Sequence, residues 1–125
     1  MKDTFHGTKV VTALVPATQT ATLKGDAVDL QDFGSALLAV NTGAIAASGL
    51  FDIKLQESDT TADGDFADVA ATDLLGNLPN SLAASTLYRQ GYIGSKRYVR
   101  AAITKQSGTS IAAAAVFILE HPALA

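Results

Sequence analysis

The feature that most constrains the fold is a series of strand-length apolar runs separated by turn residues. Most runs are rich in β-branched or aromatic residues, which favour strands over helices. The clearest runs cover residues 8–15, 35–43, 50–57, 86–93, 98–104 and 110–119. About seven to nine short strands, with turns spaced at roughly 8–12 residues, are typical of a sandwich or jelly roll. We therefore predict an all-β fold, a jelly-roll-like antiparallel β-sandwich.

The alternation of side chains predicts how each strand is covered. Segment 50–57 places Phe51, Ile53 and Leu55 on one face and polar residues on the other, which predicts a half-exposed strand. Segment 35–43 is apolar on both faces, as expected of a central strand that is covered on both sides. The two strands therefore differ in how much of their surface must be buried.

Two other segments need a separate argument. The strand that begins near Thr8 is expected to end at Pro16, because proline cannot donate a ladder hydrogen bond. The alanine run 112–115 has helical propensity by itself. However, a β-branched and aromatic stretch continues it at 116–118, and the glycine-containing segment 106–109 precedes it as a hairpin loop. We therefore predict a strand there.

Length and composition predict one domain over residues 1–125 with a thin core. The chain has 125 residues, no cysteine and no tryptophan. The lack of cysteine excludes a disulfide framework and a thiolate zinc site. Hydrophobic residues make up 48% of the chain, but many are alanine, which buries little area. A thin core makes help from neighbouring subunits reasonable, so we expect a homo-oligomer.

No segment predicts a membrane or secretory location. The longest apolar run is far shorter than the roughly 18–20 residues of a membrane helix. The residues that begin the sequence lack the continuous apolar run of a secretory signal. We expect a protein made in the cytoplasm, with no membrane partner.

Charge is distributed unevenly along the chain. Residues 1–73 carry four Lys/Arg against eleven Asp/Glu, a net of −7. Residues 74–125 carry five Lys/Arg against one Glu, a net of +4. If the two halves occupy different surfaces, the subunit is electrically two-sided and can favour copies of itself or a charged partner. If strands from both halves interleave, the asymmetry averages out.

The residues that enzymes need are absent or isolated, so we predict no enzymatic activity and no cofactor. His6 and His121 are the only histidines, one near each end of the chain. No Gly-x-Ser-x-Gly elbow is present. The glycine-containing segment 91–96 lacks the spacing of a phosphate-binding loop.

The best metal candidate is the acidic loop 59–65. Asp59, Asp63 and Asp65 partly match the opening of a calcium loop. The position that should hold a bidentate glutamate is Ala70, so a solvated acidic loop is the favoured interpretation. Calcium held in another geometry, for example at a subunit interface, stays open.

Basic and aromatic residues gather in segment 88–105. Lys96, Arg97, Tyr98 and Arg100 resemble a nucleic-acid-binding face in composition. The sequence pI of about 5.1 argues against such a partner. We therefore expect these four residues to form ion pairs and interface contacts, and we expect no nucleic-acid partner.

Several motifs together carry a resemblance over about residues 25–105. They occur at 28–36, 40–45, 51–59, 64–69, 73–76 and 91–100. Their order resembles small virion proteins of tailed bacteriophages and gene transfer agents. The resemblance is strongest to the capsid-associated group that includes head decoration and head spike-base proteins. It implies a β-sandwich without catalysis, used as an assembled structural part.

The resemblance implies a virion structural protein at the capsid surface. Such a chain would decorate the shell or seat a head spike or fibre, with the major capsid protein or a spike or fibre protein as its partner. One contact surface would contain Lys96, Arg97, Tyr98 and Arg100, and the loop 59–65 would form another. On this hypothesis, Arg100→Glu leaves the isolated fold intact and prevents incorporation into particles.

Two other functions stay open from the sequence. A tail component, such as a tail-terminator or tube-associated protein, could use the same small β-domain. A carbohydrate-binding module would stay monomeric and bind sugars through Tyr88, Tyr92 or Tyr98.

Overall fold

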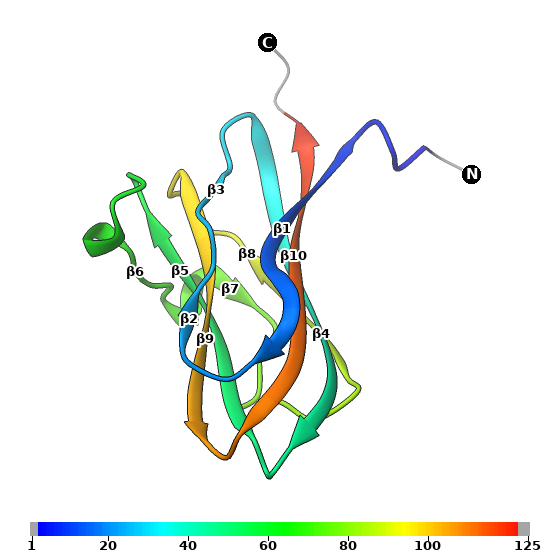
Figure 1. Ribbon diagram of the computed structural model, residues 1–125. Coiled ribbons are helices and arrows are strands. Elements are labelled where there is room, and N and C mark those ends of the chain that lie inside the picture. Colours follow the sequence, from blue (N-terminus) through cyan, green and yellow to red (C-terminus); the bar gives the residue numbers. More distant parts are fainter. Residues whose placement is uncertain (1–2, 123–125) are drawn as a thin grey trace.

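The computed structural model describes residues 3–122, which form two facing antiparallel sheets (Figure 1). The first sheet has the strand order β1-β10-β4-β8-β7, and the second has the order β2-β9-β5-β6, with β3 also paired to β9. The strands are β1 (Thr8–Gln19), β2 (Leu23–Lys24), β3 (Val28–Asp29), β4 (Phe33–Ala46), β5 (Leu50–Ser58), β6 (Ala67–Asp68), β7 (Leu74–Leu75), β8 (Leu87–Tyr92), β9 (Tyr98–Ser107) and β10 (Ser110–Pro122).

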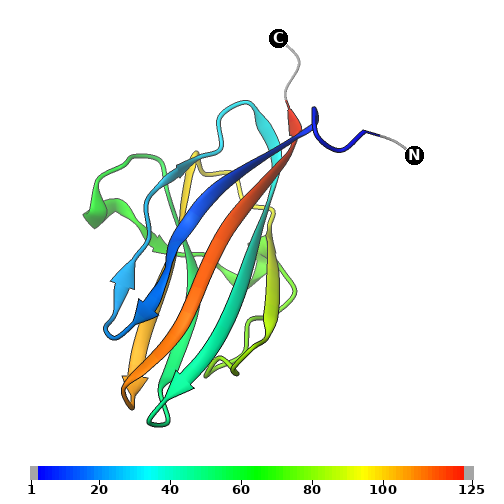
Figure 2. The same cartoon turned by 45° about the vertical axis from the view of Figure 1, so that its right-hand side comes forward.

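The connectivity is that of a jelly roll. Strands β2 and β3 both pair with β9 and act as one interrupted strand, and β7 is a two-residue addition at one edge. Without β7, and with β2 and β3 counted as one strand, each sheet has four strands: β1-β10-β4-β8 in the first and β2/β3-β9-β5-β6 in the second. In each sheet, strands from the first half of the chain pair with strands from the second half, which is the arrangement of two interleaved Greek keys. Figure 2 shows β1, β10, β4 and β8 side by side. The predicted all-β antiparallel sandwich is confirmed. The described residues 3–122 form ten strands, against the seven to nine expected, and four of the ten have only two residues.

The core lies between the sheets and is filled by alternate residues of each long strand. Phe51 and Phe117 are its largest fully buried side chains, and they come from opposite sheets. Small residues such as Ala101 and Ala115 are also buried in this core. The alanine run lies inside β10, so the predicted strand there is confirmed. As expected, segment 50–57 buries Phe51, Ile53 and Leu55 and exposes Lys54.

The predicted end of strand β1 is wrong. The strand does not end at Pro16 but continues to Gln19. Because β1 is the edge strand of the first sheet, a residue without an N–H is tolerated there. The pairing with β10 also shifts register between Leu14 and Ala17, so Pro16 lies within the irregular stretch.

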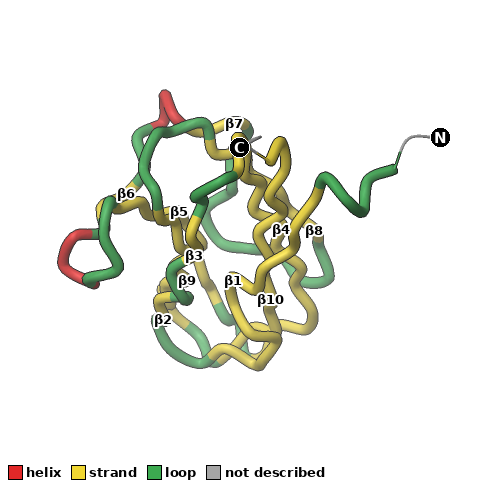
Figure 3. The backbone as a smooth tube through the Cα atoms, turned by 90° about the horizontal axis from the view of Figure 1, so that it is seen from above, coloured by secondary structure: helices red, strands yellow, loops and turns green. Residues whose placement is uncertain are grey.

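Strand β4 corrects a second expectation. It is central, between β10 and β8, but only its inner face is covered. Ala36, Leu38 and Val40 are buried, whereas the outward-facing Leu37 and Ala39 remain partly exposed. No other part of residues 3–122 lies over that outer face, because the second sheet packs on the opposite side (Figure 3).

Short turns complete the described chain. Gly108 turns the β9–β10 hairpin with a φ of 77°, and a Cβ at this position would lie 2.3 Å from the carbonyl oxygen of Ser48, so glycine is required. Two 3-10 turns, η1 (Asp63–Asp65) and η2 (Ala71–Asp73), lie in the β5–β7 connection. Within residues 3–122, no helix has the length and apolar character needed to cross a membrane.

Candidate assembly surfaces

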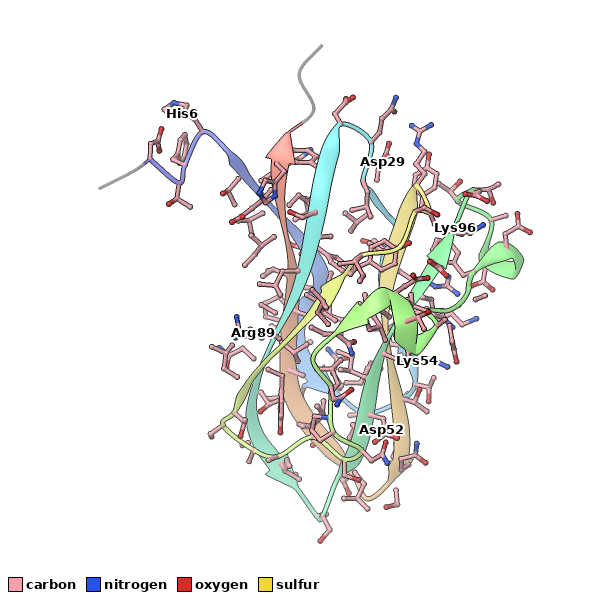
Figure 4. The ribbon with its side chains drawn as sticks, turned by 180° about the vertical axis from the view of Figure 1, so that it is seen from behind. His6, Asp29, Asp52, Lys54, Arg89 and Lys96 are labelled. Carbon is pink, nitrogen blue, oxygen red and sulfur yellow. The ribbon has the colours of Figure 1, made fainter. Side chains whose placement is uncertain are left out.

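Charged side chains concentrate on the outer side of the second sheet and at its upper end. We call this surface the charged face. It contains the ion pairs Lys24–Asp63, Lys54–Asp68, Lys96–Asp59, Arg97–Asp29 and Arg100–Asp63. Figure 4 shows Lys54 and Lys96 on this side of the molecule, whereas Arg89 lies on the opposite side.

Arg100 fixes the acidic loop to the second sheet. It lies on the outer face of β9 and is only 6% exposed. Its Nε donates to Gln56 Oε1 at 2.8 Å, and its Nη1 donates to Asp63 Oδ1 at 2.7 Å. The guanidinium carbon lies 4.1 Å from the centre of the Phe66 ring, which covers it. Arg100 therefore holds η1 and Phe66 against the sheet.

This geometry changes the expectation for Arg100. A glutamate at a position that is 6% exposed would face the carboxylate of Asp63, so it would loosen the loop in the isolated chain. From these contacts we expect Arg100→Glu to loosen the loop, whereas the sequence alone led us to expect an intact isolated fold. Arg100 positions the acidic loop, and its own side chain is too buried to contribute much contact area to a partner.

Lys96, Arg97 and Tyr98 lie together at the upper end of the sandwich. Arg97 donates from Nε and Nη2 to the two carboxylate oxygens of Asp29, at 3.0 and 2.9 Å. Its guanidinium also lies 5.1 Å from the centre of the Tyr98 ring. Lys96 Nζ donates to Asp59 at 2.9 Å. All four charged side chains keep 43% or more of their surface, so they remain available to a partner.

The ion pairs move the pKa values of their members in the expected directions. The hydrogen bonds from Arg97 lower the pKa of Asp29, and those from Arg100 and Lys24 lower the pKa of Asp63. In return, the contact with Asp59 raises the pKa of Lys96. Each of these shifts favours the charged form of Asp29, Asp63 or Lys96.

Tyr92 connects the two sheets beneath this surface. It comes from β8 of the first sheet, is 3% exposed, and donates its hydroxyl to Glu57 Oε1 on β5 at 2.7 Å. The Tyr92 hydroxyl oxygen in turn accepts the backbone N–H of Lys96 at 3.1 Å. Burial, followed by the bond to Glu57, raises the pKa of Tyr92. Sequence reasoning missed this link, although strand alternation in 87–92 places Tyr92 on the inner face.

The aspartates of the acidic loop do not gather into a metal site. Asp59 accepts from Lys96, Asp63 accepts from Arg100 and Lys24, and Asp65 accepts from Thr60 at 2.6 Å. Within residues 3–122, no group of three acidic, histidine or cysteine side chains is placed to hold a metal ion. The loop is thus a set of separate ion pairs and hydrogen bonds, and the calcium hypothesis has no structural support.

The uneven charge of the two halves of the chain is neutralised inside the subunit. Lys96, Arg97 and Arg100 come from the basic half, and their partners Asp59, Asp29 and Asp63 come from the acidic half. The strands of both halves interleave in each sheet, so the second alternative from the sequence applies. The basic segment forms ion pairs, as expected.

The three tyrosines do not share a surface. Tyr92 is buried, and Tyr88 faces inward on the same strand, where its hydroxyl accepts the backbone N–H of Ala83. Tyr98 lies on the other sheet. The structure therefore does not bring these three rings together on one open face.

Two features resemble parts of an active site. A hollow of about 400 Å³ at the upper end is lined in part by Ser35, Tyr92 and Lys96. At its border, the Ser35 hydroxyl lies 2.8 Å from Nδ1 of His121. Within residues 3–122, no carboxylate bonds to that imidazole, so the third group that orients a catalytic histidine is missing.

No protein-family model matches the sequence, and no curated protein matches it. Solved structures share the fold. The SPBc2 prophage-derived protein YomS is 17% identical, with a TM-score of 0.53, and the match covers 91% of this chain and 93% of that one. VP2 from the infectious bursal disease virus subviral particle is 10% identical, with a TM-score of 0.57, covering 91% of this chain and 32% of VP2. The chain thus spans about a third of the length of VP2.

Proposed function

We propose that this chain is a non-enzymatic virion structural protein of the phage type. It assembles as an oligomer on the capsid, where it decorates the shell or seats a head spike or fibre. The observation that carries this proposal is the likeness over nearly the whole chain to a prophage-derived protein, together with the likeness to part of a viral particle protein. The motif order in residues 28–100 supports the same group.

The charged face supplies the contact with the shell. Arg97, Lys96 and Tyr98 lie on one end of the sandwich and keep exposed polar atoms beside Asp29 and Asp59. Such mixed charges favour a specific docking orientation more than high affinity. Arg100 acts indirectly, because it holds the neighbouring loop in place.

The experiment is fractionation of particles that carry a tagged copy of the chain. Heads and tails are separated, and the tagged chain is followed in each fraction by immunoblot and by electron microscopy. Recovery on the head surface supports the proposal. Recovery with tails favours the tail component, and absence from both fractions overturns the virion role.

A double substitution tests the proposed contact. Lys96→Glu with Arg97→Glu reverses two exposed charges, so incorporation into particles should fall at least about tenfold, as expected for loss of charge pairing at an interface. Lys105→Glu is the control, because Lys105 is an exposed cation at the other end of β9. Equal incorporation of all three proteins would remove Lys96 and Arg97 from the contact.

A further inference from the structure

The outer face of the first sheet lies on the other side of the molecule from the charged face and takes no part in the proposed contact with the shell. It carries apolar side chains from all five strands, and we call it the apolar face. It includes Val10, Leu37, Leu75, Leu87, Val116 and Ile118. Val10, Leu75 and Leu87 are 62%, 57% and 72% exposed. Large apolar side chains gathered on one exposed face mark an interaction site.

The sequence pattern also predicts that this face is covered. Strand β4 is apolar on both sides over residues 36–40, and β10 is apolar on both sides over residues 111–119. An antiparallel strand that faces water normally alternates apolar and polar residues, as β5 does in this chain. Residues 3–122 cover only the inner faces of β4 and β10. Residues 3–122 therefore do not supply the cover that this pattern predicts for the outer faces.

Two charged side chains of opposite sign flank the middle of the apolar face. Arg89 on β8 pairs in register with Ala39, and Glu120 on β10 pairs in register with Ser35. Both Ala39 and Ser35 lie on β4, two residues to either side of Leu37. Leu37 is therefore midway between the positive and the negative group, one strand away from each.

We propose that the apolar face packs against the same face of a second copy, around a two-fold axis that passes through Leu37. A two-fold axis that lies in the interface, perpendicular to the line from Arg89 to Glu120, exchanges the two flanking positions. It therefore places Arg89 opposite Glu120 of the partner subunit, and it creates this ion pair twice. No other partner is required to match these charges, because each copy carries both.

A hollow beside Leu37 gives the contact a place to interlock. Gly91 is the residue of β8 opposite Leu37, and it has no side chain to fill the face. A cavity of about 230 Å³ lies there, lined in part by Leu37, Leu75, Gly91 and Ile118. This volume accommodates a leucine side chain, so Leu37 or Leu75 of a second copy can enter it.

The size of the face sets the strength of the contact. Four strands spaced at about 4.8 Å, over about six residue steps of 3.4 Å, together with the two-residue β7, give on the order of 400 Å² per copy. The total of roughly 800 Å² is in the range of weak, transient interfaces. A reversible dimer with a dissociation constant on the order of 1–100 µM is therefore expected. The inference rests on the oligomeric part of the proposed function, but dimerisation itself is measured on the purified chain without particles.

The test is sedimentation of the purified full chain over a dilution series. Wild type should change from dimer to monomer on dilution. Arg89→Glu and Glu120→Arg should each weaken the dimer about tenfold or more, because each change places like charges together. The double variant should regain most of the affinity, since its pairs are restored in reverse. Lys105→Glu, the same charge change on the second sheet, should leave the dimer unchanged.

A second variant keeps the test independent of charge. Leu75→Asp changes a side chain that is 57% exposed, so it should fold and remain monomeric. Unaltered circular dichroism verifies its fold. Three results would overturn the inference. The wild-type chain could stay monomeric above about 100 µM, or it could form a dimer that none of the face variants weakens. It could also be a monomer that binds particles and loses that binding in Leu75→Asp. The last result would assign the face to the shell protein. A dimer that is absent from particles refutes only the virion role.

Discussion

Tyr92→Phe tests whether the Tyr92 hydroxyl joins the two sheets and orders the segment that carries Lys96. The substitution keeps the buried ring and removes one oxygen. That oxygen donates to Glu57 at 2.7 Å and accepts the backbone N–H of Lys96 at 3.1 Å. Because Tyr92 is only 3% exposed, water has little access to replace the two hydrogen bonds that the substitution removes.

The expected cost follows from the two bonds. A hydrogen bond to a charged acceptor contributes about 1–2 kcal/mol when that acceptor keeps some contact with water, as the half-buried Glu57 does. The bond from a backbone N–H contributes about 0.5 kcal/mol when the N–H can turn to solvent. The free energy of unfolding should therefore fall by about 1.5–2.5 kcal/mol, which lowers the melting temperature by about 5–9 °C in a chain of this size.

Thermal unfolding at neutral pH measures this change, and hydrogen exchange at the amide of Lys96 measures the local effect. Tyr98→Phe is the matched control, because Tyr98 is half-buried on the other sheet and its hydroxyl has no hydrogen bond within the described residues. It should shift the melting temperature by less than about 1 °C. Equal shifts in the two variants, or no faster exchange at Lys96, would refute the role given to Tyr92.

Three further predictions concern the charged face. Arg100→Met should lower stability by about 1–3 kcal/mol through lost hydrogen bonds and cation–π contact, and hydrogen exchange should rise in residues 59–66. The pKa values of Asp29 and Asp63 are lowered from 3.8 in the folded chain. Their contribution to stability is therefore complete above about pH 5 and is lost as pH falls through the lowered pKa values, which acid titration of unfolding detects. A calcium chelator should change neither the melting temperature nor the oligomeric state, since the loop aspartates are held by cations and a hydroxyl of the chain.

Local patterns predicted most of the long strands but not their ends. The alternation in β5 and the apolar run of β10 depend only on which face meets the core, and both were predicted correctly. The end of β1 was not, because the tolerance of Pro16 depends on β1 being an edge strand. Strand order is a non-local property, so one sequence pattern does not reveal it.

The charged face was predicted in composition but not in arrangement. Ion pairs at Lys96, Arg97 and Arg100 were expected, yet their partners lie 37 to 68 residues away in the chain. The burial of Arg100 depends on Phe66, which belongs to a loop with no periodic pattern. Such partners become visible only when the β3 and β5–β6 connections are placed beside β9.

The prediction for β4 differs from the structure in a way that indicates a further contact. The sequence predicts cover on both faces, and the chain alone provides it on one. The buried core includes small residues such as Ala101 and Ala115, whereas the larger Leu37, Val116 and Ile118 lie on the outer face and stay partly exposed. Their burial in a contact would add apolar stabilisation that residues 3–122 do not supply on their own. The proposed second copy would cover the outer faces of β4 and β10, which the sequence pattern predicts to be covered.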